Sequence, residues 1–219
     1  MSAFFSFNTY KVGWCSFDMT VVIDSGILCG GLSRRMKGQE KGLTHFRGQA
    51  MVTCIAQALC SSTNQLRVNC NQEQSAYQNL GFETCSDAIA GHKGPLAGIH
   101  SLLAHSVADY MLLAPCDTPL LSSDYAQNML AAVDEFQQNK PNIPLIFAAE
   151  SKGKLHPLHI CIARSLLTDI EVYLASGERR VMAWLNAHQV QHVTFTDHAQ
   201  FQNVNSLDEL RQLNLDHPL

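Results

Sequence analysis

The strongest constraint on the fold of this 219-residue chain is a repeated alternation of short apolar segments with segments of helical periodicity. The first apolar segment, Val21–Leu28, is rich in β-branched residues and runs into Cys29-Gly30-Gly31. The most apolar one, Asp109–Ala114, runs into Pro115-Cys116-Asp117. Strands that alternate with helices are typical of an α/β fold with a three-layer, doubly wound, mostly parallel sheet of Rossmann-like type.

The other elements follow from periodicity and from helix boundary residues. Lys152-Gly153-Lys154 predicts a hairpin turn, and Ser206 to Glu209 has the pattern of a capping box for a last helix. The remaining predicted strands cover 66–69, 82–85, 144–149, 158–162 and 190–195, and the remaining predicted helices cover 51–60, 72–79, 95–105, 122–138, 165–175 and 178–187.

Ligands of such sheets bind at the carboxyl ends of the strands. The segments that follow Leu28, Asn69, Cys85 and Ala114 are therefore expected along one edge. This edge is where the sequence places a functional site.

Composition excludes several classes of protein. A net charge of −4 disfavours a general nucleic-acid binder, and no apolar run approaches the roughly 18–20 residues of a membrane span. The eight cysteines form no C-x-x-C pair and are mostly set in apolar runs, which suits a reducing compartment. We expect a cytoplasmic monomer that binds neither nucleic acid nor a membrane.

Residues 1–20 are aromatic-rich but lack the features of a signal peptide. They form either an extension, ordered on the domain or disordered, or a start-site artefact with Met19 as the true start, and the second interpretation is preferred. Residues 21–219 show neither repeats nor linkers, and they are expected to form a single domain.

The loop after the first strand combines Gly30 and Gly31 with the cations Arg34, Arg35 and Lys41. Backbone N–H groups and positive charge are what a triphosphate needs, both for binding and for the departure of pyrophosphate. The loop matches neither G-x-x-x-x-G-K-[ST] nor G-x-G-x-x-G, so a dinucleotide oxidoreductase is disfavoured. A surface turn with solvated arginines is the alternative.

The segment from Leu28 to Lys41 resembles the signature L-[AG]-G-G-x-S-x-R-M-G-x-x-K of the molybdopterin-type nucleotidyltransferases. The double glycine resembles their guanylyltransferase branch, although Cys29 replaces the usual alanine and Lys37-Gly38 departs from the family pattern. Five further segments resemble family motifs in the same order within residues 20–212: Val68-Asn69-Cys70-Asn71, Gly94-Pro95-Leu96-Ala97-Gly98, Ala114-Pro115-Cys116-Asp117-Thr118-Pro119, Gly177-Glu178-Arg179-Arg180-Val181 and Asn203-Val204-Asn205.

This resemblance implies a Mg²⁺-dependent enzyme that transfers GMP from GTP to the terminal phosphate of molybdenum-molybdopterin. The products would be the guanine dinucleotide cofactor and pyrophosphate. A molybdopterin cytidylyltransferase and a sugar-phosphate nucleotidyltransferase are the nearest alternatives, and a non-catalytic GTP-binding cofactor chaperone is an alternative of another class. A labile cofactor would favour transient contacts with insertion proteins and molybdoenzyme chaperones.

Asp117 is the expected Mg²⁺ ligand, because Mg²⁺ takes one or two carboxylates together with substrate phosphates. Alone, it would be equally well explained as a turn aspartate before Pro119. Lys41, Asp117 and Arg35 are the expected catalytic residues. The resemblance implies nucleotide binding by Leu28, Cys29, Gly30, Gly31, Lys41, Asn69, Asp87 and Asp117. It implies a molybdopterin side formed by Arg35, Gly94, Pro95, Gly98, His156, Arg179, Arg180, Asn203 and Asn205.

Several of these residues have simpler explanations. Asn69 and Asp87 could be turn formers at strand ends, and Arg180 could pair with Glu178 or Asp197 as a structural contact. His156 and His159 have a spacing that could suit zinc, but no third ligand lies near them in the sequence.

Overall fold

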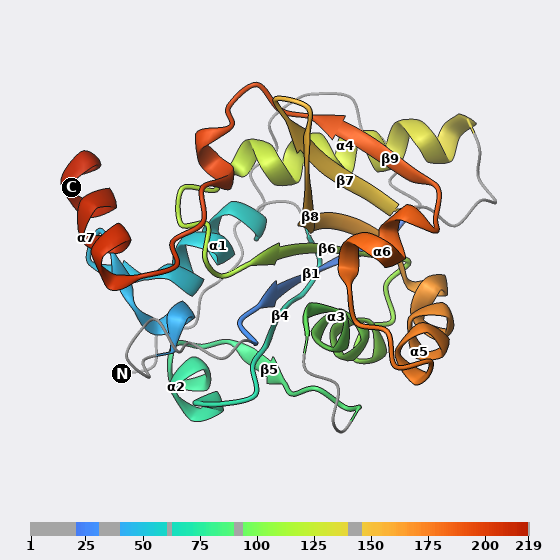
Figure 1. Ribbon diagram of the computed structural model, residues 1–219, viewed down its shortest axis with the longest axis horizontal. Coiled ribbons are helices and arrows are strands. Elements are labelled where there is room, and N and C mark those ends of the chain that lie inside the picture. Colours follow the sequence, from blue (N-terminus) through green and yellow to red (C-terminus); the bar gives the residue numbers. More distant parts are fainter. Residues whose placement is uncertain (1–20, 31–39, 61–62, 90–93, 140–145, 219) are drawn as a thin grey trace.

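The computed structural model describes residues 21–30, 40–60, 63–89, 94–139 and 146–218. Its centre is a seven-stranded sheet in the order β5-β4-β1-β6-β8-β7-β9, shown in Figure 1. The strands are β1 (Ile23–Leu28), β4 (Leu66–Asn69), β5 (Glu83–Cys85), β6 (Tyr110–Pro115), β7 (Ile146–Ser151), β8 (Lys154–Ala163) and β9 (Val190–Thr194).

Most strand pairs are parallel, as predicted. The β1–β4, β1–β6, β4–β5 and β7–β9 pairs are parallel, and β8 runs antiparallel to both β6 and β7. The antiparallel strand arises from the predicted hairpin turn, where Lys152 and Gly153 both have positive φ and Ser151 pairs with Lys154. The expected α/β fold class is confirmed.

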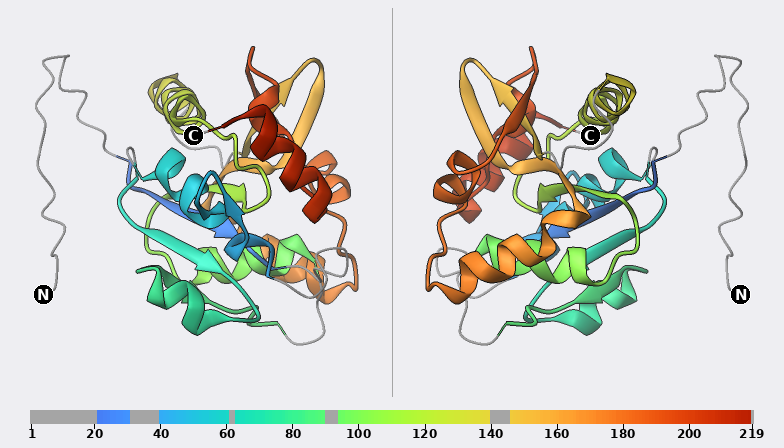
Figure 2. Two further views of the ribbon diagram at one scale, coloured as in Figure 1. Left: turned by 90° about the vertical axis from the view of Figure 1, so that its left-hand side faces the viewer. Right: turned by 90° about the vertical axis from the view of Figure 1, so that its right-hand side faces the viewer.

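Helices cover both faces of the sheet and make three layers, seen from the side in Figure 2. The helices are α1 (Met51–Leu59), α2 (Gln74–Asn79), α3 (Pro95–Ala104), α4 (Ser123–Asn139), α5 (Leu167–Ala175), α6 (Val181–Asn186) and α7 (Leu207–Asp216). Alternation along β6 explains the layers, because Leu112 packs with α1 and α4 whereas Leu113 packs with α3, α5 and α6.

The strand and helix predictions are correct to within a few residues at most boundaries. Two differences concern strands. β8 begins at Lys154 rather than at residue 158, because its first half continues the hairpin ladder. A small second sheet, β2 (His45–Phe46) and β3 (Gln49–Ala50), was not predicted; its turn has positive φ at Arg47 and Gly48.

The C-terminal helix α7 lies against this small sheet and α1. Leu210 and Leu213 are buried with Phe46 and Met51, and the backbone N–H of Arg47 donates to the side chain of Asn214 at 2.8 Å. Ser206 caps α7 as predicted, since its hydroxyl accepts from the N–H of Glu209 at 3.2 Å. The segment that precedes α7 is thereby held across the ligand edge of the sheet.

Candidate functional site

Three parallel strands end together at the predicted edge. Leu28 of β1 is paired with Asn69 of β4 on one side and with Pro115 of β6 on the other. Backbone bonds continue past the strands, from the N–H of Cys29 to the carbonyl of Asn69 (2.8 Å) and from the N–H of Cys116 to the carbonyl of Leu28 (3.1 Å). The segment after β1, which is the predicted phosphate loop, and the segments after β4 and β6 therefore start at the same level of one sheet edge.

Lys41 and Asp117 meet at this edge. Nζ of Lys41 lies 2.8 Å from Oδ2 of Asp117, and their side chains are only 18% and 17% exposed. Nζ also donates to Oδ1 of Asn205 at 3.0 Å. The backbone N–H of Val204 donates to the carbonyl of Asp117 at 2.8 Å, so the segment before α7 touches both members of the pair.

The other carboxylate oxygen of Asp117 suits a cation. Oδ1 is buried and has no hydrogen-bond partner among the described residues. An unpaired buried carboxylate oxygen is costly unless a ligand supplies the missing partner. The described ranges contain no cluster of three or more His, Cys, Asp or Glu side chains that could hold a metal. Asp117 thus fits a Mg²⁺ ion that completes its shell with substrate phosphate and water.

Asn69 and Asp87 form the second part of the edge. Asn69 is 1% exposed, and its Nδ2 donates to Oδ1 of Asp87 at 3.1 Å. Two glycines leave the space for this amide. A Cβ atom at Gly98 would lie 2.4 Å from Oδ1 of Asn69, and one at Gly30 would lie 3.2 Å from it. The structure therefore places Gly98, expected on the molybdopterin side, directly behind Asn69.

An aromatic and histidine cluster supports the loop that carries Asp117. Oγ1 of Thr118 lies 3.1 Å from Nε2 of the buried His159. Burial, with a smaller contribution from His156, lowers the pKa of His159 to about 3. The imidazole is therefore neutral at physiological pH. The ring of His156 stacks on Phe201 at 4.2 Å, and burial, helped by Lys154, also lowers its pKa.

His156 and His159 do not form a zinc pair with a third described ligand. Their rings are 5.8 Å apart, and Nε2 of His156 is bonded to the Ser151 hydroxyl at 2.8 Å. These contacts give both histidines a structural explanation. His156 keeps partial exposure, as a residue of the expected substrate side should.

Other residues expected on the molybdopterin side are more dispersed. Gly94, the residue before α3, lies near the backbone of Arg179, since a Cβ atom there would be 3.7 Å from its carbonyl oxygen. Arg180 is exposed and forms a loose ion pair with Glu178 at 3.8 Å. This pair is the structural contact that the sequence offered as the alternative to a substrate role. Asn203 is exposed, and Pro95 is the first residue of α3. Gly31 and Arg35 lie outside the described residues.

Thiols and a phenol pack around Cys29, where the predicted phosphate loop begins. Burial, followed by the Cys116 thiol, raises the pKa of Cys29, so Cys29 is a neutral packing group beside Tyr77. Gly42 allows this packing, because a Cβ atom there would lie 2.6 Å from the Tyr77 hydroxyl oxygen. All cysteines within the described ranges are free.

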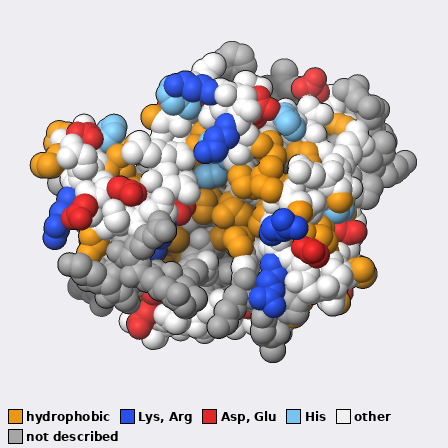
Figure 3. Space-filling model, viewed as in Figure 1, with side chains coloured by type: hydrophobic (Ala, Val, Ile, Leu, Met, Phe, Trp, Pro, Cys, Tyr) orange, Lys and Arg blue, Asp and Glu red, His pale blue; other side chains and the backbone are white. Residues whose placement is uncertain are grey.

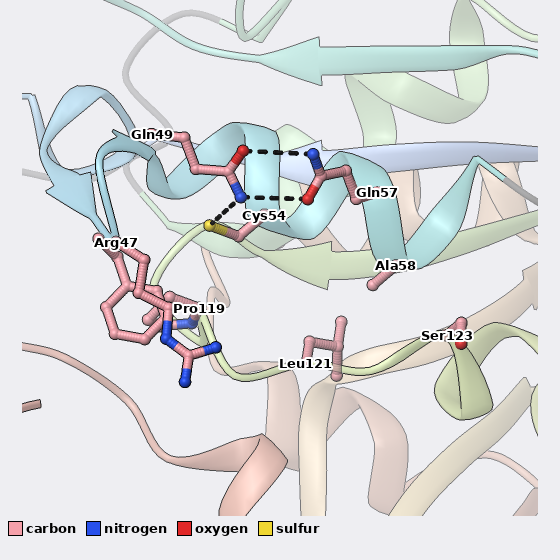
Figure 4. Close-up of a pocket in the computed structure, with 9 residues that line it drawn as sticks. Arg47, Gln49, Cys54, Gln57, Ala58, Pro119, Leu121 and Ser123 are labelled. Atoms are coloured by element: carbon pink, nitrogen blue, oxygen red, sulfur yellow. Dashed lines mark hydrogen bonds between the residues drawn. The ribbon is translucent and has the colours of Figure 1, made fainter. Parts of the chain in front are cut away.

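Two hollows lie beside this edge. One of about 550 Å³ is next to Lys41, between the start of α7 and the η2 turn (Lys41–Leu43). The other, of about 320 Å³, lies between α1, the β2–β3 turn and the loop after Pro119 (Figure 4). There the amides of Gln49 and Gln57 bond each other at 3.1 and 3.2 Å. These amides are satisfied by one another, and Arg47, which also lines this hollow, donates from Nε to the carbonyl of His217 at 2.8 Å.

The surface near β6 to β8 has a different character. Figure 3 shows a hollowed area whose floor is formed by hydrophobic side chains and whose border carries Lys, Arg and His side chains, with some Asp and Glu side chains beside them. In the first half of β8, Leu155, Pro157 and Leu158 are partly exposed. An apolar floor with cations at its border suits a planar ring that carries phosphate.

Two contacts were missed by the sequence analysis. Asn71 was noted only as part of a motif, yet it bonds Asp87; its spacing of two from Asn69 was the available signal. Asn205 was assigned to the substrate side, and the structure brings it to Lys41. No local pattern could indicate the second contact, because the residues are 164 positions apart.

A mostly parallel sheet that brings a lysine, an aspartate and closely packed glycines to its carboxyl edge is the arrangement expected of a nucleotidyltransferase. In a comparison with known protein families, residues 26–193 match the family described as the MobA-like NTP transferase domain. The chain belongs to this family.

Relatives and solved structures agree. A molybdenum cofactor guanylyltransferase from Shewanella frigidimarina is 34% identical over 197 residues, covering 89% of this chain and 97% of the relative. A protein of the same name from Cupriavidus pinatubonensis is 34% identical over 185 residues, covering 84% and 92%. These names favour guanylyl transfer over the alternatives considered above.

The fold is shared with solved structures. Molybdopterin-guanine dinucleotide biosynthesis protein A from Archaeoglobus fulgidus superposes with a TM-score of 0.69 at 20% identity, covering 88% of this chain and 97% of that one. A nucleotidyl transferase from Methanothermobacter thermautotroptrophicus gives a TM-score of 0.68 at 13% identity, with coverage of 89% and 97%. In the described part of the chain, every helix is too short or too polar to cross a membrane.

Proposed function

We propose that this chain transfers GMP from GTP to the terminal phosphate of molybdenum-molybdopterin, with release of pyrophosphate. The observation that carries the proposal is the pair of Lys41 and Asp117 at the strand edge, with one Asp117 oxygen buried and unpartnered. The names of the relatives indicate the nucleotide and the acceptor.

The reaction needs one displacement at phosphorus. An oxygen of the acceptor's terminal phosphate forms a bond to the α-phosphorus of GTP, and the bond from that phosphorus to the bridging oxygen of the β-phosphate breaks. The electron pair leaves with pyrophosphate. Because the attacking phosphate is already anionic, no strong general base is required, and the described site offers positioning and charge rather than a nucleophile.

Each part of the edge has a role in this scheme. The N–H groups that follow Cys29 hold phosphate oxygens, and Lys41 neutralises charge as pyrophosphate forms. Asp117 holds Mg²⁺, which when bound would neutralise the triphosphate. Asn69 and Asp87 bind the nucleoside. The apolar floor near β8, with the cations at its border, receives the pterin and its phosphate (Figure 3).

Lys41 has to leave Asp117 when nucleotide arrives. Its ammonium neutralises the carboxylate, with Nζ 2.8 Å from Oδ2. A triphosphate offers Lys41 a stronger anion, and the Asp117 carboxylate would then be available to hold a Mg²⁺ ion. Asn205 keeps the ammonium at the site during this exchange, because its amide oxygen is a neutral second acceptor.

Residues 21–219 are proposed to act as one domain, which the packing of α7 against α1 and β2 supports. A monomeric state, a cytoplasmic location and handover contacts with insertion proteins and chaperones stay predictions from the sequence.

The test is pyrophosphate release with GTP, CTP, ATP or UTP, with Mg²⁺, and with or without molybdopterin. GTP-selective release that requires molybdopterin is the expected result. Preference for CTP would indicate a cytidylyltransferase, and GTP binding without any release would indicate a non-catalytic carrier. Either of these results would overturn the proposal.

A further inference from the structure

Asp87 lies just after β5 and is held from two sides by asparagine amides. Nδ2 of Asn69 donates to its Oδ1 at 3.1 Å, and Nδ2 of Asn71 donates to its Oδ2 at 2.9 Å. Each carboxylate oxygen thus has one amide donor. A carboxylate has about four acceptor positions, so both oxygens keep capacity for a ligand.

Asn71 differs from Asn69 in that it also accepts from Asp87. The backbone N–H of Asp87 donates to Oδ1 of Asn71 at 2.9 Å. The two residues are therefore joined by a closed pair of hydrogen bonds, one to the backbone and one to the carboxylate. This arrangement fixes the plane of the carboxylate relative to its own main chain.

The two amides are supported differently. Asn69 is buried and confined by Gly98 and Gly30. Asn71 is exposed, so its bonds to Asp87 compete with water and contribute little to folding. An exposed amide that makes two bonds to one carboxylate residue is better explained by orientation of that carboxylate than by stability.

The position of the carboxylate indicates what it recognises. A Cβ atom at Gly30, in the proposed phosphate loop, would lie 3.2 Å from Oδ1 of Asn69 and 3.5 Å from Nδ2 of Asn71. The amides that orient Asp87 therefore border the phosphate loop itself. A nucleoside that extends from phosphates on this loop along the ends of β4 and β5 brings its base or ribose towards Asp87.

Guanine presents two adjacent donors, N1–H and the 2-amino group, which match the two oxygens of one carboxylate. Charge-assisted bonds of this bidentate kind are strong and depend on orientation. Resting on the proposed function, we propose that Asn71 is a positioning residue for guanine selection, which holds the Asp87 carboxylate in the plane that accepts from both donors.

The experiment measures nucleotide binding by calorimetry, with GTP and with ITP, which lacks the 2-amino group. The variants are Asn71→Ala, Asp87→Ala and the double variant, and Asn79→Ala on the exposed surface of α2 is the matched control. Thermal unfolding is recorded for each variant. Since the readout is binding, it does not depend on turnover or on the acceptor.

We expect the wild-type protein to prefer GTP over ITP by about tenfold, the effect of one hydrogen bond to a charged group. Asn71→Ala should weaken GTP binding by about tenfold and bring the ratio of the two affinities close to one, with an unchanged melting temperature. In the Asp87→Ala background, removal of Asn71 should have no further effect, because Asn71 acts through Asp87.

Equal weakening of GTP and ITP by Asn71→Ala would overturn the inference, and so would an additive loss in the double variant. The first result would show that Asn71 supports the strand edge generally, and the second that it contacts the nucleotide itself. Failure of the proposed function would give a different result. GTP would still bind selectively and this selectivity would depend on Asn71, but no pyrophosphate would be released with molybdopterin. That result would contradict guanylyl transfer and leave the role of Asn71 intact.

Discussion

The ammonium group of Lys41 lies 2.8 Å from the carboxylate of Asp117, although the two residues are 76 positions apart in the chain. The η2 turn brings Lys41 to the edge from one side, and the end of β6 brings Asp117 from the other. A partly buried ion pair adds little to the stability of the folded protein, since the desolvation of the two charges offsets much of their attraction. Its position where three parallel strands end is better explained by function.

Asp117→Asn should abolish most turnover while the protein stays folded. The substitution keeps the size of the side chain but removes the charge that holds Mg²⁺ and that pairs with Lys41. We expect a loss of about a hundredfold or more in kcat, comparable to removal of a principal electrostatic group from an active site. Pyrophosphate release at saturating Mg²⁺ is the measurement.

Asp124→Asn is the matched control, because Asp124 is exposed in the first turn of α4. It should retain wild-type turnover. Wild-type turnover of Asp117→Asn at saturating Mg²⁺ would exclude the metal role.

Asn205→Ala tests whether the segment before α7 takes part in the site. The variant removes one acceptor from the Lys41 ammonium and leaves its bond to Asp117. A hydrogen bond of about 1 kcal/mol corresponds to about a fivefold loss of kcat/KM for GTP. Lys41→Met should lose much more, and the double variant should be no worse than Lys41→Met alone.

Steady-state kinetics with GTP as the varied substrate distinguishes the outcomes. Asn186→Ala, at the exposed end of α6, is the control and should behave as the wild type. If Asn205→Ala changed only the KM for molybdopterin, Asn205 would be a substrate residue, as the sequence resemblance implied, rather than a partner of Lys41.

Much of the fold could be predicted because its strands and helices are long enough to show a period. The strand at 66–69 was predicted to the residue, and the β7–β8 turn was predicted from Lys152-Gly153-Lys154. The β2–β3 ladder could not be predicted in this way, since strands of two residues have no period.

The site was predictable in its parts but not in its contacts. Lys41 and Asp117 were each expected at the ligand edge, and the structure brings them together. The bonds of Asn205 to Lys41 and of Thr118 to His159 depend on how distant segments return to the edge. Such contacts are properties of the packed chain, and the local sequence at either partner does not encode them.

Gly98→Ala should impair nucleotide binding through Asn69. The added methyl group would lie 2.4 Å from Oδ1 of Asn69 and 3.0 Å from Cδ2 of Leu28, so the buried amide must move and Asp87 loses one of its two donors. Alanine favours the helical state of α3, so the helix itself should tolerate the change. We expect the Kd for GTP to rise about tenfold.

The control is Gly26→Ala in β1, where a methyl group would meet Leu102 at 2.7 Å in the core. It should lower the melting temperature through overpacking without changing GTP affinity. An unchanged Kd in Gly98→Ala, measured by calorimetry, would show that Asn69 does not position the nucleotide site.

The buried imidazole of His159 predicts a pH dependence of stability. Burial lowers its pKa from 6.5 to about 3, so the folded protein keeps it neutral while the unfolded chain takes up a proton below pH 6.5. The contribution of His159 to the free energy of unfolding should therefore be complete above pH 6.5. It should fall as the pH drops towards about 3, by up to about 1.4 kcal/mol per pH unit. Denaturant unfolding from pH 7.5 to 5 gives the slope of the unfolding free energy against pH.

His159→Gln should flatten this slope by that amount, whereas His198→Gln, which removes an exposed ring, should not. A slope that is the same in His159→Gln and the wild type would contradict the prediction and would mean that His159 is charged or solvated in the folded protein.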